Sequence, residues 1–327
     1  MKYINPGYSK LISAHCAYPT NQSADVIPSA TQSRTGVAFY NSSSDHKYTN
    51  VVDCLPYSSG SEIWFKADIY LPSTLGKNFT FRLDNGSGLY IYTASGYYND
   101  ACYYIGDTGT YFVRNGDFNT LQESTGLRIG LNTIWVHVLL DSNNGYIEFK
   151  INNKYFGKFY GNTIPKGYNS SATYYYAYLL LYASSSEILF SDIIVSDDEE
   201  ISPSERVVLL PVSSTVTNME SLESGLYVAD SASETILQSV DTSALIQEYG
   251  SDTNVTGIAL IGNPAYQVDD VIGNITALSA DNNVVTEHEK ITLATSTDAI
   301  ISSCFTMPTD TTIANLANMQ FGWRAEE

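Results

Sequence analysis

The sequence predicts an almost all-β protein of two domains, and three features support this prediction. Short apolar segments with period-two alternation recur at intervals of roughly ten residues in the first part of the chain. Asn- and Gly-containing turns separate them. A polar, proline-bearing stretch at residues 196–206 then marks a change in composition. We therefore expect an N-terminal β-sandwich over residues 1–203 and a smaller β-sandwich-like domain with one short helix over residues 204–327.

The segment 134–160 carries the strongest strand signal. Residues 134–140 are apolar apart from His137, as in a strand buried on both faces, and residues 146–151 alternate between apolar and polar side chains. The turns at 143–145 and 152–153 contain Asn and Gly, which tolerate positive φ. The segment is therefore predicted to be an antiparallel meander of three strands.

Residues 62–71 predict another strand with two distinct faces. Ile63, Phe65, Ala67, Ile69 and Leu71 fall on an apolar face, opposite a polar face with Glu62, Trp64, Lys66, Asp68 and Tyr70. No helix is expected before residue 200. Further strands are predicted at residues 37–40, 78–84, 89–93, 103–105, 110–113, 174–182 and 188–195.

The acidic run at residues 197–200 is interpreted as a solvated linker, with a metal site as the less favoured alternative. Four consecutive carboxylates do not converge in the way that a calcium loop requires. An apolar strand is predicted just after it, at residues 207–212. The linker therefore leads directly into the second domain.

One helix is expected in the second domain. Asp241 or Thr242 is a suitable N-cap, residues 244–249 have helical apolar spacing, and Gly250 is a typical C-terminal stop. Strands are predicted around it at residues 225–229, 256–261, 274–279 and 290–294.

Charge and composition limit the partners. The 327 residues carry a formal charge of −19, so duplex DNA or an anionic membrane surface would repel the protein. No apolar run is long enough for membrane insertion, and the first residues lack the apolar region of a standard secretory signal. The charge is interpreted as a solubility feature. No cofactor is expected, and calcium binding stays open as an alternative.

The four cysteines predict neither a disulfide scaffold nor a metal site. Cys16, Cys54, Cys102 and Cys304 are scattered, and no CxxC motif or Cys/His cluster is present. Although His15 adjoins Cys16, neighbouring residues on a strand point to opposite faces. Buried thiols are the favoured interpretation.

The acidic residues do not predict catalysis. Glu62 and Asp68 share a predicted face but lie six residues apart, roughly 20 Å along a strand, and Glu148 stands between Tyr146 and Lys150. Glycosidases need two carboxylates across one bond. An acid pair assembled from distant strands stays open, but the sequence favours a protein that is not an enzyme.

The histidines support the same conclusion. No Gly-x-Ser-x-Gly elbow is present. His137, inside a strand, is predicted to be a hydrogen-bonded structural residue, and His288 an exposed loop residue. General bases are therefore scarce.

Tyrosine-rich segments are the candidate ligand-binding residues, because aromatic rings stack on sugars while Asn and Asp hydrogen-bond hydroxyl groups. Packing within the sandwich, or a subunit interface, would explain the same tyrosines. The candidates are Tyr97, Tyr98, Asn99, Asp100 and Tyr103 in one segment and Tyr174 and Tyr176, which share a strand face, in another.

Two resemblances extend these expectations. The Trp-x-His-Val strand at 135–138, followed by Gly-x-Ile-x-Phe-x-Ile at 145–151 and an Asn-Asn turn, resembles the centre of the concanavalin A-like, laminin-G-like jelly roll. Residues 190–197 running into 207–212, with 255–266 and 319–325, resemble tail-associated structural proteins of bacteriophages and prophages, which couple such a domain to a C-terminal β-domain.

The second resemblance implies a non-enzymatic virion protein, part of a phage tail or fibre. Its jelly-roll domain is expected to bind a bacterial-surface glycan or receptor, and its second domain to anchor or oligomerise. Other virion proteins are the expected partners, a homo-oligomer is expected by analogy, and assembly would take place in the host cytoplasm. A purely structural or decorating subunit without a ligand and, third, a glycoside hydrolase are the alternatives.

Overall fold

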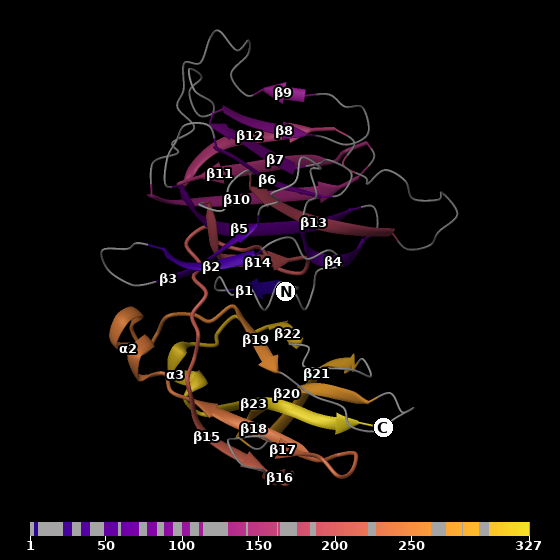
Figure 1. Cartoon of the computed structure of the whole chain (residues 1–327), viewed down its shortest axis with the longest axis vertical. Helices are drawn as coiled ribbons and strands as arrows, with labels where there is room; N and C mark the ends of the chain where they lie inside the picture. Colours follow the sequence, from indigo (N-terminus) through magenta and orange to yellow (C-terminus); the bar gives the residue numbers. More distant parts are fainter. Residues whose placement is uncertain are drawn as a thin grey trace. The chain divides into compact units, whose positions relative to one another are not determined.

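The computed structural model shows a protein made mostly of β-strands, which confirms the all-β class (Figure 1). No helix in the described segments has the length and apolar character needed to cross a membrane. The structure describes residues 3–5, 22–27, 34–39, 49–57, 60–71, 77–83, 88–93, 100–104, 111–113, 130–141, 143–161, 163, 175–183, 188–221, 227–262, 273–282, 284–293 and 301–326.

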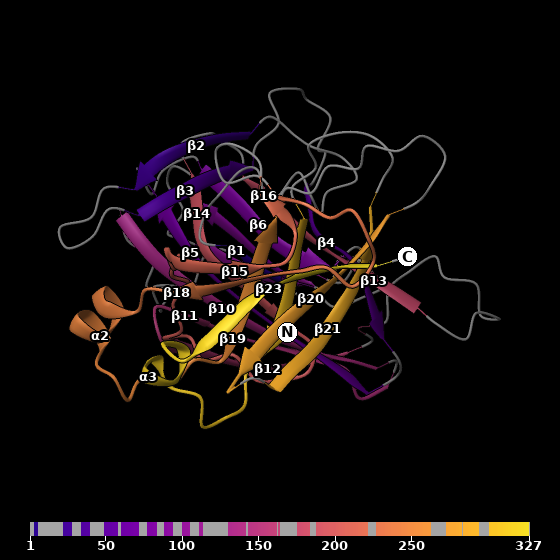
Figure 2. The same cartoon turned by 90° about the horizontal axis from the view of Figure 1, so that it is seen from below.

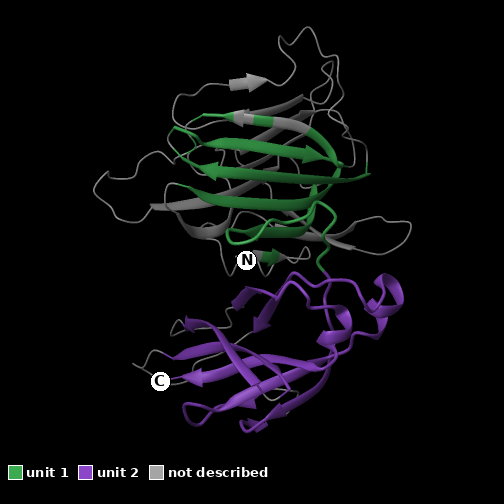
Figure 3. Cartoon of the chain, turned by 180° about the vertical axis from the view of Figure 1, so that it is seen from behind, with its two compact units in different colours: residues 1–207 green, residues 208–327 purple. Residues whose placement is uncertain are grey.

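The chain divides into two compact units, residues 1–207 and 208–327 (Figure 3). The boundary expected at residue 203 lies slightly before this division. Residues 206 and 207, beyond the expected boundary, are bonded to the first unit because Asp192 Oδ1 accepts hydrogen bonds from Val207 N at 2.7 Å and Arg206 Nε at 3.3 Å.

Two antiparallel sheets make up the described part of the first unit. The first sheet has the order β12 (Lys154–Tyr160), β11 (Tyr146–Ile151), β10 (Gly130–Leu140), β5 (Ser61–Leu71), β14 (Leu189–Ser196), β3 (Arg34–Phe39) and β2 (Gln22–Ile27), with β1 (Tyr3–Asn5) paired to β14. The second has the order β4 (Thr49–Tyr57), β13 (Tyr175–Ala183), β6 (Lys77–Leu83), β7 (Gly88–Thr93), β8 (Asp100–Tyr104) and β9 (Tyr111–Val113).

The centre of the first sheet is buried on both faces. The apolar face of β5 is buried as predicted, from Ile63 to Leu71. On the opposite face, which carries the polar residues, Trp64, Lys66 and Asp68 are also buried. Part of the cover comes from the segment after β14, because Trp135 Nε1 on β10 donates a 2.6 Å hydrogen bond to Ile201 O.

The two reversals of the predicted meander are built differently. At the second, Asn152 and Asn153 have φ of 48° and 64°, as their sequence predicts. At the first reversal, none of the described residues 143–145 has a positive φ, contrary to expectation. Asp141 Oδ1 instead accepts hydrogen bonds from Asn143 N and Asn144 N, each 2.7 Å long. Gly145 is needed because a Cβ there would collide with Thr163 and nearby backbone oxygens.

The second unit contains a five-stranded antiparallel sheet and two smaller strand pairs (Figure 2). A core of Phe305, Met307, Leu316 and Phe321 lies within this unit. The sheet has the order β15 (Val212–Thr217), β18 (Thr235–Val240), β23 (Met319–Glu326), β20 (Asn274–Asp281) and β21 (Val284–Thr292); β19 (Gly257–Gly262) pairs with β22 (Ile301–Thr306), and β16 (Glu220–Ser221) with β17 (Tyr227–Val228).

The predicted helix is confirmed as α2 (Ser243–Tyr249), flanked by Thr242 and Gly250. Asp241 Oδ1 accepts a hydrogen bond from Ser243 N at 2.9 Å, although the Thr242 side chain makes no capping bond. A second helix, α3 (Ile313–Leu316), was not expected. Its four residues are too few to show helical periodicity.

Two predictions for the second unit are wrong. Residues 207–211 are not a strand, and β15 begins only at Val212, after Pro211, which has no backbone N–H to donate. His288 is not an exposed loop residue. It lies on β21, half-buried, with its ring stacked on Phe305 at 3.6 Å between centroids and its Nε2 2.8 Å from Ser279 Oγ.

Candidate functional site

Strand register gathers a polar and aromatic cluster on the Glu62 face of the first sheet. One row across β5, β10, β11 and β12 consists of Trp64, His137, Glu148 and Lys158. The neighbouring row joins Glu62, Leu139, Tyr146 and Tyr160. We call Glu62, His137, Tyr146, Glu148, Tyr155, Lys158 and Tyr160 the His137 patch.

His137 lies at the centre of the patch between two carboxylates. Its Nδ1 is 2.7 Å from Glu148 Oε1, and its Nε2 is 3.6 Å from Glu62 Oε1. The ring also stacks on Trp64, with centroids 4.6 Å apart, and meets Tyr146 edge-on at 5.3 Å. His137 Nε2 is buried and has no hydrogen-bond partner in the part of the chain that the structure describes. The predicted structural role of His137 is therefore consistent with its contacts, and its Nε2 approaches Glu62 without a hydrogen bond.

Glu148 is the acceptor that holds the patch together. Besides His137, it accepts a 2.9 Å hydrogen bond from Tyr155 Oη and lies 3.3 Å from Lys158 Nζ. Its side chain is 14% exposed, so a carboxylate with three donors satisfies both its charge and its lone pairs. Glu148 is thus a positioning group rather than a group open to a ligand.

Glu62 is more open than Glu148. Its side chain is 39% exposed and accepts a 3.2 Å hydrogen bond from Tyr146 Oη. Glu62 therefore presents acceptor capacity at the surface, in contrast to Glu148, whose side chain is only 14% exposed.

A register shift in β12 brings three of its side chains to the same face. Glu148 pairs with Lys158 but Lys150 pairs with Tyr155, so β12 holds one extra residue between them. Without this bulge, Tyr155 and Lys158 would fall on opposite faces. With it, Tyr155, Lys158 and Tyr160 all join the patch.

Two tyrosine rings form its exposed rim. Tyr155 is 51% and Tyr160 is 68% exposed. Beneath Tyr160, Tyr146 meets its ring at 67° with centroids 5.9 Å apart, and Lys158 Nζ lies 3.7 Å from the centre of the Tyr146 ring. The rings are therefore supported from below by packed neighbours.

The contacts fix the protonation states of several groups. Burial tends to raise the pKa of Glu148, but hydrogen bonds from His137 and Tyr155 and the charge of Lys158 lower this pKa overall. Burial and the hydrogen bond to Glu148 raise the pKa of Tyr155. Burial tends to lower the pKa of Lys158, but its hydrogen bonds and charge interactions with Tyr146 and Glu148 raise this pKa overall. At neutral pH the patch therefore contains a glutamate anion, a neutral tyrosine donor and a lysine cation.

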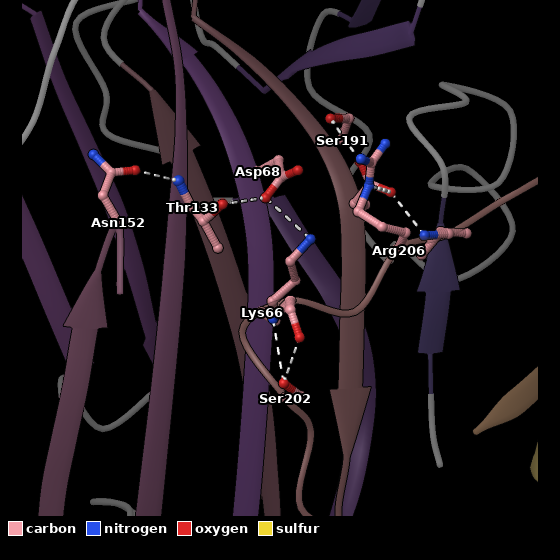
Figure 4. A network of polar contacts seen from close by, with 10 residues as sticks. Lys66, Asp68, Thr133, Asn152, Ser191, Ser202 and Arg206 are labelled. Carbon is pink, nitrogen blue, oxygen red and sulfur yellow. Dashed lines mark hydrogen bonds and ion pairs between the residues drawn. The ribbon is translucent and has the colours of Figure 1, made fainter. Parts of the chain in front are cut away.

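Beside the patch, a buried polar network fixes the same strands (Figure 4). Lys66 Nζ lies 3.0 Å from Asp68 Oδ1, which also accepts a 2.8 Å hydrogen bond from Thr133 Oγ1. Thr133 N in turn donates to Asn152 Oδ1 at 2.9 Å. The network joins β5, β10 and the β11–β12 turn, and it stabilises the register on which the patch depends.

His137 separates the two carboxylates of the patch. Glycosidases place a scissile bond between two carboxylates. In the His137 patch, the imidazole ring occupies the space between Glu62 and Glu148, since each carboxylate contacts a different ring nitrogen. Among the described residues, no group of three or more His, Cys, Asp or Glu side chains has the arrangement of a metal site. Cys304 is a half-buried thiol.

The predicted ligand-binding residues are only partly described. Tyr97, Tyr98, Asn99 and Tyr174 lie outside the described residues. Asp100, Tyr103 and Tyr176 are described through their backbones, on β8 and β13 of the second sheet.

Register does not bring these positions together. Tyr103 aligns across β7 and β6 with Leu181 on β13, five residues from Tyr176. Asp100 aligns with Tyr92 and Asn78, near the end of the sheet remote from Tyr176.

Sequence reasoning missed the His137 patch. His137 and Glu148 lie on the two strands of one hairpin, in which Leu139 pairs with Tyr146 and His137 with Glu148. The hairpin is therefore centred between residues 142 and 143, and not on the turn predicted at 143–145. Glu62 arrives from a strand more than sixty residues away in the sequence, and no local pattern indicates that pairing. Comparison of the chain with protein-family models, with curated proteins and with solved structures found no match.

Proposed function

We propose that this chain is a non-enzymatic attachment protein of a phage particle, and that its first unit binds a bacterial-surface glycan through the His137 patch. The observation that carries the binding proposal is the pair of exposed rings, Tyr155 and Tyr160, beside the half-exposed carboxylate of Glu62. Aromatic faces pack against the apolar faces of sugar rings, and a carboxylate accepts hydrogen bonds from sugar hydroxyl groups.

Preorganisation supports this role. Tyr155 is held by its hydrogen bond to Glu148, and Tyr146 by Glu62 and Lys158. Side chains that are already ordered lose less conformational entropy when a ligand binds. A rigid aromatic rim is therefore suited to the weak, shallow contacts that a single sugar unit offers.

The charges indicate which glycans are favoured. Glu148 and Lys158 neutralise each other within the patch, whereas Glu62 faces solvent on a protein with a net charge of −19. An acidic polysaccharide would meet repulsion from Glu62 and from the whole chain. A neutral or amino-bearing sugar is the chemical class that fits.

The virion part of the proposal is supported by the sequence resemblances and by the all-β architecture with two compact units. It is also compatible with a subunit that has no ligand and serves only as a structural or decorating component. Hydrolysis is disfavoured because His137 fills the position between the two patch carboxylates.

The test is glycan binding by the full chain, measured on an array of neutral, amino and acidic bacterial glycans and quantified by calorimetry. Tyr160→Ala and Glu62→Gln are expected to weaken binding at least tenfold, because one removes the exposed ring and the other the exposed charge. Tyr98→Ala, in the segment that the sequence favoured, serves as the matched variant and is expected to bind normally.

Each of the other possible results of this test would contradict a specific part of the proposal. Loss of binding in Tyr98→Ala with normal binding in Tyr160→Ala would move the site to residues 97–104. No binding by the folded wild-type protein would favour the structural subunit. Release of reducing sugar from a polysaccharide would overturn the non-enzymatic assignment.

A further inference from the structure

The two edges of the five-stranded sheet in the second unit differ in charge. The edge strand β21 carries Glu287, Glu289 and Lys290, and Arg324 Nη1 on β23 forms an ion pair with Glu287 at 2.6 Å. Charged side chains on an edge strand prevent it from pairing with another chain. The opposite edge strand, β15, contains no charged residue.

The uncharged surface continues beyond β15. Residues 207–219 contain no Asp, Glu, Lys, Arg or His. Four large apolar side chains in this stretch are exposed, by 42% at Val208, 55% at Leu209, 52% at Val212 and 59% at Val216. In the described residues, β15 pairs only with β18, so its other edge has open backbone groups. Such an edge is a template for strand pairing.

The net charge of the chain indicates which partner can pair with the free edge of β15. Two copies of a chain with a net charge of −19 repel each other over most of their surfaces. A strip of thirteen consecutive uncharged residues, 207–219, is a place where two copies approach without bringing like charges together. We infer that β15 pairs with β15 of a second copy, antiparallel about a two-fold axis, to form a dimer.

The details of β15 limit the interface. A register shift between Val212 and Ser214 leaves Ser214–Thr217 as the regular part of the strand, and Pro211 ends the ladder on one side. So short a ladder buries little surface, and the apolar side chains must contribute. The dimer is therefore expected to be weak, with a micromolar dissociation constant, and to place Val216 at its centre.

Sedimentation velocity of the full chain over a range of concentrations tests the inference. The wild-type protein is expected to shift from monomer to dimer as its concentration rises. Val216→Lys is expected to stay monomeric, because a cation on the strip is desolvated on pairing. Val284→Lys, at a residue 68% exposed on the charged edge β21, is the matched control and is expected to dimerise normally. Circular dichroism and thermal melting confirm that both variants are folded.

Salt gives an independent readout. Because screening weakens the repulsion between the two negative chains, dimerisation is expected to tighten as the salt concentration rises. A strictly monomeric wild-type protein, a dimer that survives in Val216→Lys, or a dimer that weakens with salt would each overturn the inference. None of these results depends on whether the His137 patch binds a glycan.

Discussion

His137 Nδ1 and Glu148 Oε1, directly opposite each other on β10 and β11, are joined by a 2.7 Å hydrogen bond. This bond connects the buried centre of the first sheet to its exposed tyrosine rim. Glu148 also receives Tyr155 and Lys158, so one carboxylate aligns side chains from two neighbouring strands. Several consequences of this arrangement are open to measurement.

Glu148→Ala is expected to lower the free energy of unfolding by about 2–3 kcal/mol, because it leaves His137 and Tyr155 without their acceptor and Lys158 without its counter-charge. Urea unfolding measures the change. Glu200→Ala, at an exposed position in the acidic run, is the control and is expected to stay within about 0.5 kcal/mol of the wild type. Equal free energies of unfolding for the two variants would show that the Glu148 contacts make no net contribution to stability.

The stabilising effect of Glu148 is expected to depend on acid pH. Its folded-state pKa is lower than the ordinary value of 4.5, so its contribution is fully present above that value. The contribution is lost as the pH falls from 4.5 through the folded-state pKa. Unfolding free energies measured from neutral pH to about pH 3 are expected to fall more steeply for the wild type than for Glu148→Gln. Parallel curves would contradict the assignment.

Gly145→Ala is expected to destabilise the β10–β11 hairpin by at least about 2 kcal/mol, because the added methyl group meets Thr163 and backbone oxygens of residues 141 and 161. Chemical denaturation is the measurement. Asn144→Ala changes an exposed neighbour in the same turn and retains the backbone N–H that bonds to Asp141, so it is expected to be nearly neutral. A neutral Gly145→Ala would mean that the turn relaxes without cost.

Asp192→Ala is expected to release the end of the first unit. Asp192 has φ of 47° and is buried, and its Oδ1 accepts hydrogen bonds from Val207 N and Arg206 Nε. Limited trypsin digestion is expected to cleave after Arg206 faster in this variant than in the wild type. Asp192→Asn tolerates the same backbone conformation and retains an acceptor, so intermediate protection is expected. Identical cleavage rates in all three proteins would refute the anchoring role.

His288 is expected to make the second unit acid-sensitive. Burial lowers its folded-state pKa below the ordinary value of 6.5, so the folded protein favours the neutral ring. Its contribution to stability is present above pH 6.5 and is lost as the pH falls through the folded-state pKa. Between pH 7.5 and about pH 5, the melting temperature is expected to drop less in His288→Gln than in the wild type. An equal drop would assign the acid sensitivity to other groups.

The sequence by itself determined the local architecture of this protein. Alternation in residues 62–71 and 146–151 predicted β5 and β11, Asn152-Asn153 predicted the turn between β11 and β12, and Thr242 with Gly250 bounded α2. These features depend on side-chain period, on backbone φ and on capping groups, which act over a few residues. They are therefore legible in a single chain.

Only the tertiary structure decided which of these segments meet. It placed Glu62 beside His137, turned Tyr155, Lys158 and Tyr160 to one face through a bulge, and buried Lys66 and Asp68 on the face of β5 that carries its polar residues. It also placed His288, which was predicted to lie in a loop, on β21, with its ring stacked on that of Phe305. Contacts between distant strands depend on register and on what covers each face, and neither quantity is encoded in the local period of the residues.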